Sequence, residues 1–368
     1  MSDWKYVKIG DVCIVERGGS PRPIDKYITD KEDGINWIKI GDTSDSMYIT
    51  STAQRIIPEG MKKSRYVKAG DFLLSNSMSF GRPYILKIDG CIHDGWLVLR
   101  DENDLFDKRF LYYYLSAPVT YEKFKKMAVG GVVNNLNSEM VRGVTIPLPP
   151  RTEQESIADT LDDVSNLISL RKQQLEKIEE LVKSRFIEMF GDRYINDRNW
   201  NCKPLYECAD FYNGKAHEQV VDENGEYILV TSRCIASDIT DYRRTNELLF
   251  PLRTNDIVMV MSDVPNGRAI GKCLLIDEDN KYTLNQRICC FRNYLLNPIY
   301  FSYLLNRHEY FLSFDDGNAQ TNLRKDDLLA CSIIIPPMDL QERFAALVEQ
   351  IDKSKYHGEF LYSKEVAA

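Results

Sequence analysis

Residues 146–155 read Ile-Pro-Leu-Pro-Pro-Arg-Thr-Glu-Gln-Glu, and residues 333–342 read Ile-Ile-Ile-Pro-Pro-Met-Asp-Leu-Gln-Glu. The proline pair and the Gln-Glu pair recur at a constant separation of 187 residues, and each segment leads into a long helix-like stretch. Asn135-Leu136 and Asn322-Leu323 keep the same separation. Several matches at one offset identify two copies of a single unit. The chain is therefore predicted to be built as domain, helix, domain, helix.

The repeat extends upstream of these segments, with small insertions and deletions. Gly81-Arg82 matches Gly267-Arg268, and residues 105–115 match residues 295–305. Few other identities survive between the copies. This pattern is typical of a shared scaffold that carries two different recognition surfaces.

The repeat predicts four parts: a first domain over residues 1–150, a central helix over 151–195, a second domain over 196–337, and a shortened C-terminal helix with a tail over 338–368. Both domains contain short apolar runs bounded by Gly, Asp and Ser, which predict strands. These runs are residues 35–40, 71–74, 84–88 and 97–99 in the first copy and 227–230, 257–261, 273–276 and 288–291 in the second. A short helix is expected after them, over 106–115 and 297–305. The fold class is α+β.

The two long helices carry a narrow apolar stripe. In the first helix its residues are spaced by steps of four and three, except where Arg171 interrupts, which is the spacing of a coiled-coil seam. The seam residues are Ile157, Leu161, Val164, Ile168, Leu175, Ile178, Val182, Phe186 and Met189 in the first helix and Phe344, Leu347, Val348 and Ile351 in the second. We expect the two helices to pair as an antiparallel coiled coil with pseudo-two-fold symmetry, although a helix lying on a globular core is an alternative. Thr152 and Asp339 suit capping boxes. Gly358 is expected to end the second helix at about half the length of the first.

Composition sets broad limits. The chain has 368 residues, 43% hydrophobic and 28% charged, as in soluble globular proteins. Nine cysteines with no C-x-x-C pair give neither a zinc nor a disulfide framework, which favours a reducing cytoplasm. We expect no signal peptide and no membrane span. The net charge of −8 argues weakly against nucleic acid, unless basic residues gather locally or a partner supplies them.

Two segments resemble catalytic motifs incompletely. Asn297-Pro298-Ile299-Tyr300 approaches the loop with which amino-methyltransferases hold a flipped base, but it lacks the second proline. A helix N-cap followed by proline explains it more simply. Residues 266–273 resemble a phosphate-binding loop, but asparagine replaces its first glycine and cysteine replaces its hydroxyl residue. The four histidines have no metal-ligand spacing. The sequence therefore predicts neither a catalytic centre nor a metal site.

The duplicated Pro-Pro and Gln-Glu segments, each closing a variable domain and opening a long helix, resemble the specificity (S, or HsdS) subunit of Type I restriction and modification enzymes. Arg17-Gly-Gly-Ser-Pro21, Thr283-Leu-Asn-Gln286 and Lys183-Ser-Arg-Phe-Ile-Glu-Met-Phe-Gly191 agree with this resemblance. It covers the chain to about residue 355. Thr283–Gln286 has no counterpart in the first copy, where Cys91-Ile-His-Asp-Gly95 stands, so equivalent DNA contacts are not expected there.

The resemblance implies a non-catalytic subunit in a bacterial or archaeal cytoplasm. Each domain is then a target recognition domain for one half of a bipartite, asymmetric site on double-stranded DNA. The helices then form a spacer and a dock for two methyltransferase (M) subunits, through which restriction (R) subunits join. S-adenosylmethionine, ATP and magnesium are expected on those partners and not on this chain. Two alternatives remain: a two-lobed protein-binding scaffold, and a self-contained adenine methyltransferase with fused recognition lobes.

Candidate DNA contacts are Arg, Lys, Asn, Gln and His residues in loops between short strands, because such side chains suit phosphates and base edges. Any one of them could equally be an ordinary solvated or turn-stabilising group. The candidates are Arg17, Arg22, Lys39, Asn76, Arg82, His93 and Asn134 in the first copy and Lys215, Arg233, Arg268, Asn285, Arg287, Gln320 and Arg324 in the second.

Overall fold

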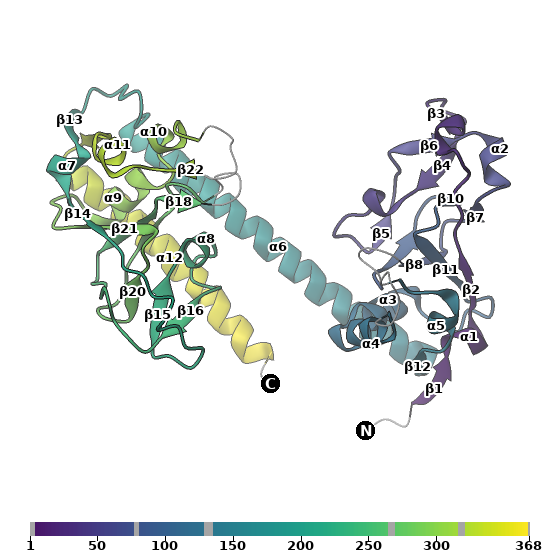
Figure 1. Ribbon diagram of the computed structural model, residues 1–368. Coiled ribbons are helices and arrows are strands. Elements are labelled where there is room, and N and C mark those ends of the chain that lie inside the picture. The colour runs from purple at the N-terminus through teal and green to yellow at the C-terminus, as the bar shows by residue number, and fades with distance from the viewer. Residues whose placement is uncertain (1–3, 77–80, 129–134, 264–268, 316–320, 367–368) are drawn as a thin grey trace. The chain divides into compact units, whose positions relative to one another are not determined.

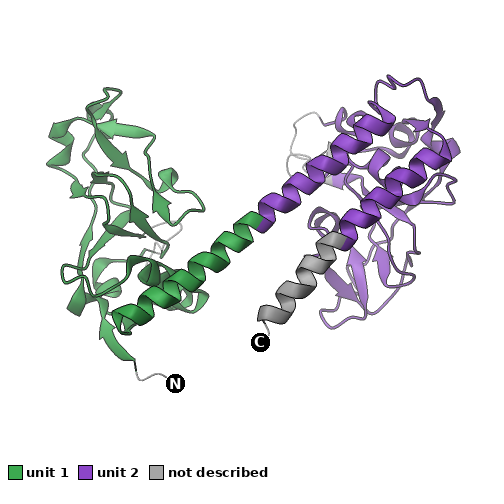
Figure 2. Ribbon diagram, turned by 180° about the vertical axis from the view of Figure 1, so that it is seen from behind, with its two compact units in different colours: residues 1–170 green, residues 171–368 purple. Residues whose placement is uncertain are grey.

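The structure is a computed structural model that describes residues 4–76, 81–128, 135–263, 269–315 and 321–366, with the side chains of all of these except residues 128, 263, 321 and 354–366. The chain divides into two compact units, Met1–Leu170 and Arg171–Ala368 (Figure 2). Helix α6 (Arg151–Phe190) begins in the first unit and ends in the second (Figure 1).

Unit 1 contains two mixed sheets and a two-stranded ribbon. Their strand orders are β2-β11-β8-β9-β5, β3-β6-β4-β10-β7 and β1-β12. The strands are β1 (Lys5–Lys8), β2 (Ile14–Arg17), β3 (Ile28–Thr29), β4 (Ile35–Ile38), β5 (Tyr48–Ile49), β6 (Gln54–Ile56), β7 (Arg65–Val67), β8 (Phe72–Ser75), β9 (Pro83–Leu86), β10 (Gly90–Ile92), β11 (Trp96–Arg100) and β12 (Thr145–Leu148). The helices are α1 (Ile9–Val12), η1 (Ile24–Lys26), η2 (Ile40–Asp42), α2 (Pro58–Met61), α3 (Lys108–Ser116), α4 (Pro118–Ala128) and α5 (Ser138–Arg142).

Unit 2 repeats this plan with fewer strands. Its strand orders are β14-β21-β17-β19, β16-β15-β20, β13-β23 and β18-β22. The strands are β13 (Asn201–Pro204), β14 (Asp210–Asn213), β15 (Tyr227–Val230), β16 (Arg243–Thr245), β17 (Ile257–Val260), β18 (Ser262–Asp263), β19 (Cys273–Leu275), β20 (Tyr282–Leu284), β21 (Ile288–Arg292), β22 (Thr321–Asn322) and β23 (Ser332–Ile335). The helices are α7 (Leu205–Cys208), α8 (Ser232–Ala236), α9 (Pro298–Leu305), α10 (Glu309–Leu312), α11 (Lys325–Leu329) and α12 (Met338–Val366).

The apolar runs of the sequence form the strands that they predicted. All eight runs coincide, within one or two residues, with β4, β8, β9, β11, β15, β17, β19 and β21. The two predicted short helices are α3 and α9. Asn297 is the N-cap of α9, its side chain accepts hydrogen bonds from the amides of Ile299 and Tyr300, and Pro298 follows it in the first turn. The simpler interpretation of that segment is therefore confirmed, as is the mixed α and β class of both units.

The repeated Gln-Glu pair has a structural role in each unit. Gln154 is 1% exposed; its Oε1 accepts from the amide of Asp107, and its Nε2 donates to the carbonyls of Leu105 and Pro149 at 3.0 and 2.9 Å. Asp107 is itself the N-cap of α3. One buried amide thus joins the start of the long helix, the end of β12 and the start of the short helix.

Gln341 repeats this arrangement in unit 2. It is 1% exposed, accepts from the amide of Asn297 at 2.9 Å and donates to the carbonyl of Pro336 at 2.8 Å. Because buried amide groups are costly when left unpaired, glutamine at this position fixes how each long helix starts from the strand before it.

Two expectations about the helix ends were wrong. Helices α6 and α12 begin at Arg151 and Met338, so Thr152 and Asp339 lie inside the first turn and are not N-caps. The carbonyls of Pro150 and Pro337 instead accept the first helical hydrogen bonds. Helix α12 also continues through Gly358 to Val366 and has 29 residues against 40 in α6. A single glycine weakens a helix by only about 1 kcal/mol, which good helix formers around it can offset.

Within unit 2, the C-terminal part of α6 packs against the first turns of α12 (Figure 2). The ring of Phe344 lies 5.4 Å from that of Phe186, and Val182 and Val348 are buried in the same cluster. The two segments run antiparallel, since Tyr303 lies near both Glu179, about two turns before Phe186 in α6, and Asp352, about two turns after Phe344 in α12. Seam residues Met189, Leu347 and Ile351 are partly buried.

The N-terminal half of the predicted seam behaves differently in unit 1. Leu161, Val164 and Ile168 are 36%, 40% and 42% exposed, while Ile157 is half-buried. Further along α6, Leu175 and Ile178 are also half-buried. Pairing along the whole seam is therefore not confirmed.

The domain boundaries placed at residues 150, 195 and 337 from the sequence stay a prediction.

The buried glutamines lead to a first prediction. Gln154→Leu leaves the Asp107 amide and two carbonyls unpaired, and we expect it to destabilise unit 1 by about 1–3 kcal/mol. A melting transition of a domain this size falls by roughly 2–4 °C per kcal/mol, so calorimetry should show a drop of several degrees. Gln341→Leu should lower the transition of unit 2 instead. Gln173→Leu, on the exposed face of α6, is the matched control. Equal effects at all three positions would contradict the structural role.

Candidate nucleic-acid interface

A tight turn joins β10 to β11 in unit 1 and brings several predicted contacts together. The amide of Gly18 donates to the carbonyl of Trp96 at 2.9 Å, and that of Gly19 donates to Ile92 at 3.1 Å. The amide of Trp96 closes the turn onto the carbonyl of His93 at 3.2 Å. A Cβ atom on Gly18 would lie 2.1 Å from that same carbonyl oxygen. Only glycine permits the loop after β2 to approach the turn so closely.

Unit 2 builds the same turn between β20 and β21. The amide of Gly214 donates to Ile288 at 3.1 Å, that of Lys215 donates to Leu284 at 3.0 Å, and Ile288 closes the turn onto Asn285 at 3.1 Å. A Cβ atom on Gly214 would lie 2.0 Å from the carbonyl oxygen of Asn285. The turns therefore match atom for atom along the backbone.

This match corrects one conclusion from the sequence. Cys91-Ile-His-Asp and Thr283-Leu-Asn-Gln occupy equivalent positions, with His93 matching Asn285 and Asp94 matching Gln286. The two segments share no residue, so sequence comparison alone could not align them. The second copy's motif does have a structural counterpart in the first.

In unit 1 the tip of the turn is Asp94, whose backbone and side chain are both held. Its carbonyl accepts from Arg17 Nε and from Asn76 Nδ2, each at 2.9 Å. Its carboxylate accepts from Ser20 Oγ at 2.6 Å and lies 3.5 Å from the guanidinium of Arg22. The hydrogen bond from Ser20 lowers the pKa of Asp94, so the side chain is ionised at neutral pH.

Three predicted contacts of unit 1 thus meet at Asp94, but they differ in exposure. The side chain of Arg22 is 81% exposed and Arg17 is exposed, so both reach the surface beside the tip. Asn76 is 1% exposed, so its hydrogen bond to the Asp94 carbonyl supports the turn from inside. Its Oδ1 has no hydrogen-bond partner among the described residues. Ser20 and Asp94 were not predicted from the sequence, because amides and cations are the side chains ordinarily expected at DNA.

In unit 2 the tip is Gln286, which lines a hollow of about 370 Å³ with Asn285 and Arg287. Its side-chain Nε2 donates to Glu218 Oε1 at 2.8 Å, and its backbone amide donates to Asn285 Oδ1. Arg233 lines the same hollow, is 74% exposed and pairs with Asp241 at 2.5 Å. Three predicted contacts of unit 2 therefore gather in one place.

The loop beneath this tip is tied by a buried histidine. His217 is 1% exposed; its Nδ1 lies 2.6 Å from the carbonyl of Lys215, and its Nε2 lies 2.9 Å from Thr283 Oγ1. The first residue of the Thr283–Gln286 segment therefore supports the loop that carries exposed Lys215.

The other predicted contacts are more dispersed. The Nδ1 of His93 accepts from the amide of Gly95 at 2.6 Å, and burial lowers its pKa, so the ring is neutral and structural. Lys39 donates to Gln54 at 2.7 Å, and Arg82 and Arg324 are exposed. Asn134, Arg268 and Gln320 lie outside the described residues. Whether any of the fourteen residues touches DNA stays a prediction.

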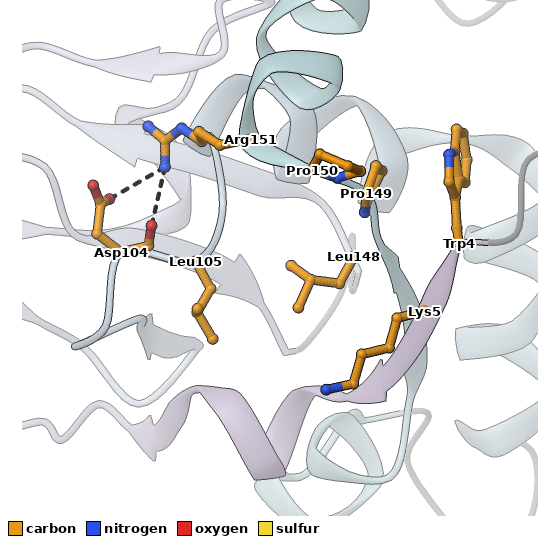
Figure 3. A pocket seen from close by; sticks show the side chains of 8 residues that line it. All are labelled: Trp4, Lys5, Asp104, Leu105, Leu148, Pro149, Pro150 and Arg151. Atoms are coloured by element: carbon orange, nitrogen blue, oxygen red, sulfur yellow. Dashed lines mark hydrogen bonds and ion pairs between the residues drawn. The ribbon is translucent and has the colours of Figure 1, made fainter.

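Another hollow of unit 1 lies beside the start of α6. It measures about 530 Å³ and is lined by Trp4, Lys5, Asp104, Leu105, Leu148, Pro149, Pro150 and Arg151 (Figure 3). Arg151 donates to the backbone carbonyl of Asp104 at 3.1 Å and pairs with its carboxylate at 3.5 Å, which fixes the helix start.

Among the residues that the structure describes, no group of three His, Cys, Asp or Glu side chains could hold a metal. None of the described helices is long and apolar enough to cross a membrane.

Comparison with known proteins assigns the chain to a family. Residues 1–180 and 197–357 match the Type I restriction modification DNA specificity domain. Two relatives from Methanocaldococcus jannaschii match over almost the whole chain. The Type I restriction enzyme MjaVIII specificity subunit is 23% identical, covering 95% of this chain and 86% of its own. The MjaIX specificity subunit is 24% identical, covering 95% and 87%.

Solved structures agree with the fold. The S subunit of a Type I restriction-modification system from M. genitalium is 14% identical, with a TM-score of 0.52 over 99% of this chain and 93% of that chain. A chain from a structural study of complex assembly and conformational transition in the type I R-M system is 15% identical, with a TM-score of 0.59 over 99% and 94%.

The close glycine contacts lead to a second prediction. Gly18→Ala forces the turn away from the loop after β2, and we expect it to destabilise unit 1 by about 1–3 kcal/mol, as overpacking does. Hydrogen exchange should accelerate at the amides of Gly18, Gly19 and Trp96. Gly41→Ala is the control, because an added Cβ there meets nothing within 4 Å. If exchange at these amides were unchanged in Gly18→Ala, the turn would not depend on this contact.

Proposed function

The chain belongs to the family of Type I restriction modification DNA specificity domains, and we propose that each of its two units reads one half of a bipartite DNA site. As a member of this family it is a DNA-recognising specificity subunit and not itself an enzyme. The observation that carries the proposal is the pair of equivalent turns, which share a backbone scaffold and differ in their side chains. A scaffold of this kind suits two readers of different sequences.

The surroundings of each turn suit DNA. Arg17 and Arg22 flank the tip in unit 1, and Arg233, Arg243 and Arg287 line the hollow in unit 2. Cations at the rim can bind phosphates, which position a protein on the duplex, while the tip side chains can contact base edges. Local gathering of arginines also explains how a chain with a net charge of −8 can bind DNA.

The long helices act as a spacer in this proposal. The seam of α6 and the seam of α12 correspond by the offset of 187 residues, which relates Ile157, Leu161 and Val164 to Phe344, Val348 and Ile351. The apolar stripe is thus repeated in both long helices. Inside unit 2, the first turns of α12 pack against α6. The helices would then pair as an antiparallel coiled coil along their length.

A second stripe on α6 is proposed as the dock for partners. Leu167, Leu170 and Leu181 are 59%, 61% and 48% exposed, and their spacing places them on one face beside the seam. Exposed leucines on a helix suit a hydrophobic protein interface. We propose that methyltransferase (M) subunits, two by the symmetry of the repeat, bind the helices and that restriction (R) subunits join through them. S-adenosylmethionine, ATP and magnesium would be bound by those partners.

A protein-binding scaffold is the second candidate function. The exposed leucines of α6 are compatible with it, but family membership favours DNA as the target of the two units. A self-contained methyltransferase disagrees with the family, whose members are specificity subunits.

The proposed function leads to a third prediction. The purified chain should neither methylate nor cut DNA, and adding cognate M subunits with S-adenosylmethionine should methylate adenine in a bipartite motif. Methylation-aware sequencing would read that motif. Replacing Asn285 and Arg287 together should change one half only. Methylation by the chain alone, or a change in both halves, would contradict independent readers on a non-catalytic subunit.

The spacer role leads to a fourth prediction. Four residues inserted after Lys172, where the side chains of α6 are exposed, would lengthen the helix by about 6 Å and nearly preserve its facing. The unspecified gap of the methylated motif should grow by about one or two base pairs, at about 3.4 Å each, with both half-sites unchanged. The control replaces Lys172 and its neighbours without changing the length. An unchanged gap would show that α6 does not set the distance.

A further inference from the structure

We propose that the two turn tips are the base-reading elements, with Asp94 recognising the amino group of a cytosine and Gln286 recognising an adenine. This inference rests on the proposed function and deepens it, because it names one specificity-determining residue in each unit. Neither side chain is among the basic and amide residues predicted from the sequence.

The first support is the shared frame around a changed side chain. In both units a glycine loop, a closing hydrogen bond and the preceding parallel strand hold the turn at equivalent atoms. The backbone therefore presents position 94 and position 286 in the same way. What differs is the chemistry at the tip, a carboxylate in one unit and a carboxamide in the other.

The second support is preorganisation. Four side chains converge on Asp94, and Arg17 and Asn76 both donate to its backbone carbonyl. Two of these side chains are long arginines at the surface, and ordering them costs entropy. A fixed tip, in contrast, lowers the entropy that binding must overcome.

The chemistry of Asp94 selects its target. The ionised carboxylate can only accept hydrogen bonds, and Ser20 occupies Oδ1. Oδ2 faces the exposed guanidinium of Arg22, which can turn to a phosphate when DNA binds. In the major groove, cytosine offers an amino donor at N4 without a neighbouring acceptor of its own, whereas adenine sets N7 beside N6. Cytosine is therefore the better match.

Gln286 carries a carboxamide, which can donate and accept hydrogen bonds, where Asp94 carries a carboxylate that can only accept them. One hydrogen of Nε2 donates to Glu218, which leaves the second hydrogen and Oε1 to act together. That donor and acceptor pair matches N7 and N6 of adenine. Glu218 fixes which end of the amide is the donor, so the side chain does not flip between two readings.

The test uses the full chain assembled with its M subunits and S-adenosylmethionine, with the methylated motif and competition binding as readouts. Asp94→Asn keeps the acceptor for Ser20 and replaces the other oxygen by a donor. We expect the preference for one base pair of one half-site to fall by about tenfold or more, with the other half unchanged. Gln286→Leu removes donor and acceptor without adding charge, and should lower the preference at one base pair of the other half by a similar factor.

Asp45→Asn is the matched control, since it removes a carboxylate from an exposed loop of unit 1 away from the turn. It should leave both half-sites unchanged. A wild-type complex that methylates a motif unaltered by Asp94→Asn and Gln286→Leu would overturn the inference while sustaining the proposed function. Weaker binding to every sequence alike would overturn it too, because the tips would then act only through charge. If the wild-type complex methylated no bipartite motif, the proposed function itself would fail.

Discussion

A buried glutamine at the start of each long helix is the constraint on which the rest of the structure depends. Gln154 and Gln341 each join a helix start, the strand before it and the N-cap of a short helix through hydrogen bonds to backbone groups. An apolar residue of the same size would leave these backbone groups unpaired in the core. The repeated Gln-Glu is thus a structural signature. It fixes how each long helix starts from the strand that precedes it.

The sequence predicted those features that local pattern determines. Apolar runs predicted eight strands within one or two residues, and the constant offset of 187 residues identified the duplication. Strand partners could not be predicted, because they depend on which edges meet; β10 and β4 pair in parallel although 54 residues separate Cys91 from Trp37. The helix start at Arg151 was missed because a proline carbonyl replaces the expected side-chain cap.

The candidate site was predicted in part. Among the residues predicted to contact DNA, Arg17, Arg22 and Asn76 meet at one tip, while Arg233, Asn285 and Arg287 share one hollow. The equivalence of Cys91–Asp94 with Thr283–Gln286 was invisible, since the two segments have no residue in common. Backbone hydrogen bonds preserve that equivalence, and such bonds do not require particular side chains. Asp94 was passed over because a carboxylate is unsuited to DNA until its neighbours are known.

The acidic character of the chain follows from the same division of roles. In the proposed function, phosphate binding needs cations only at the rim of each reading surface, and Arg17 and Arg22 lie beside Asp94. A carboxylate at the centre repels phosphates but accepts from a base amino group, so its contribution is favourable only when the correct base faces it. In the proposed role, Asp94 would therefore make non-specific binding weaker and specific binding comparatively stronger. A subunit whose task is selection, with catalysis left to partners, gains more from that contrast than from a uniformly basic surface.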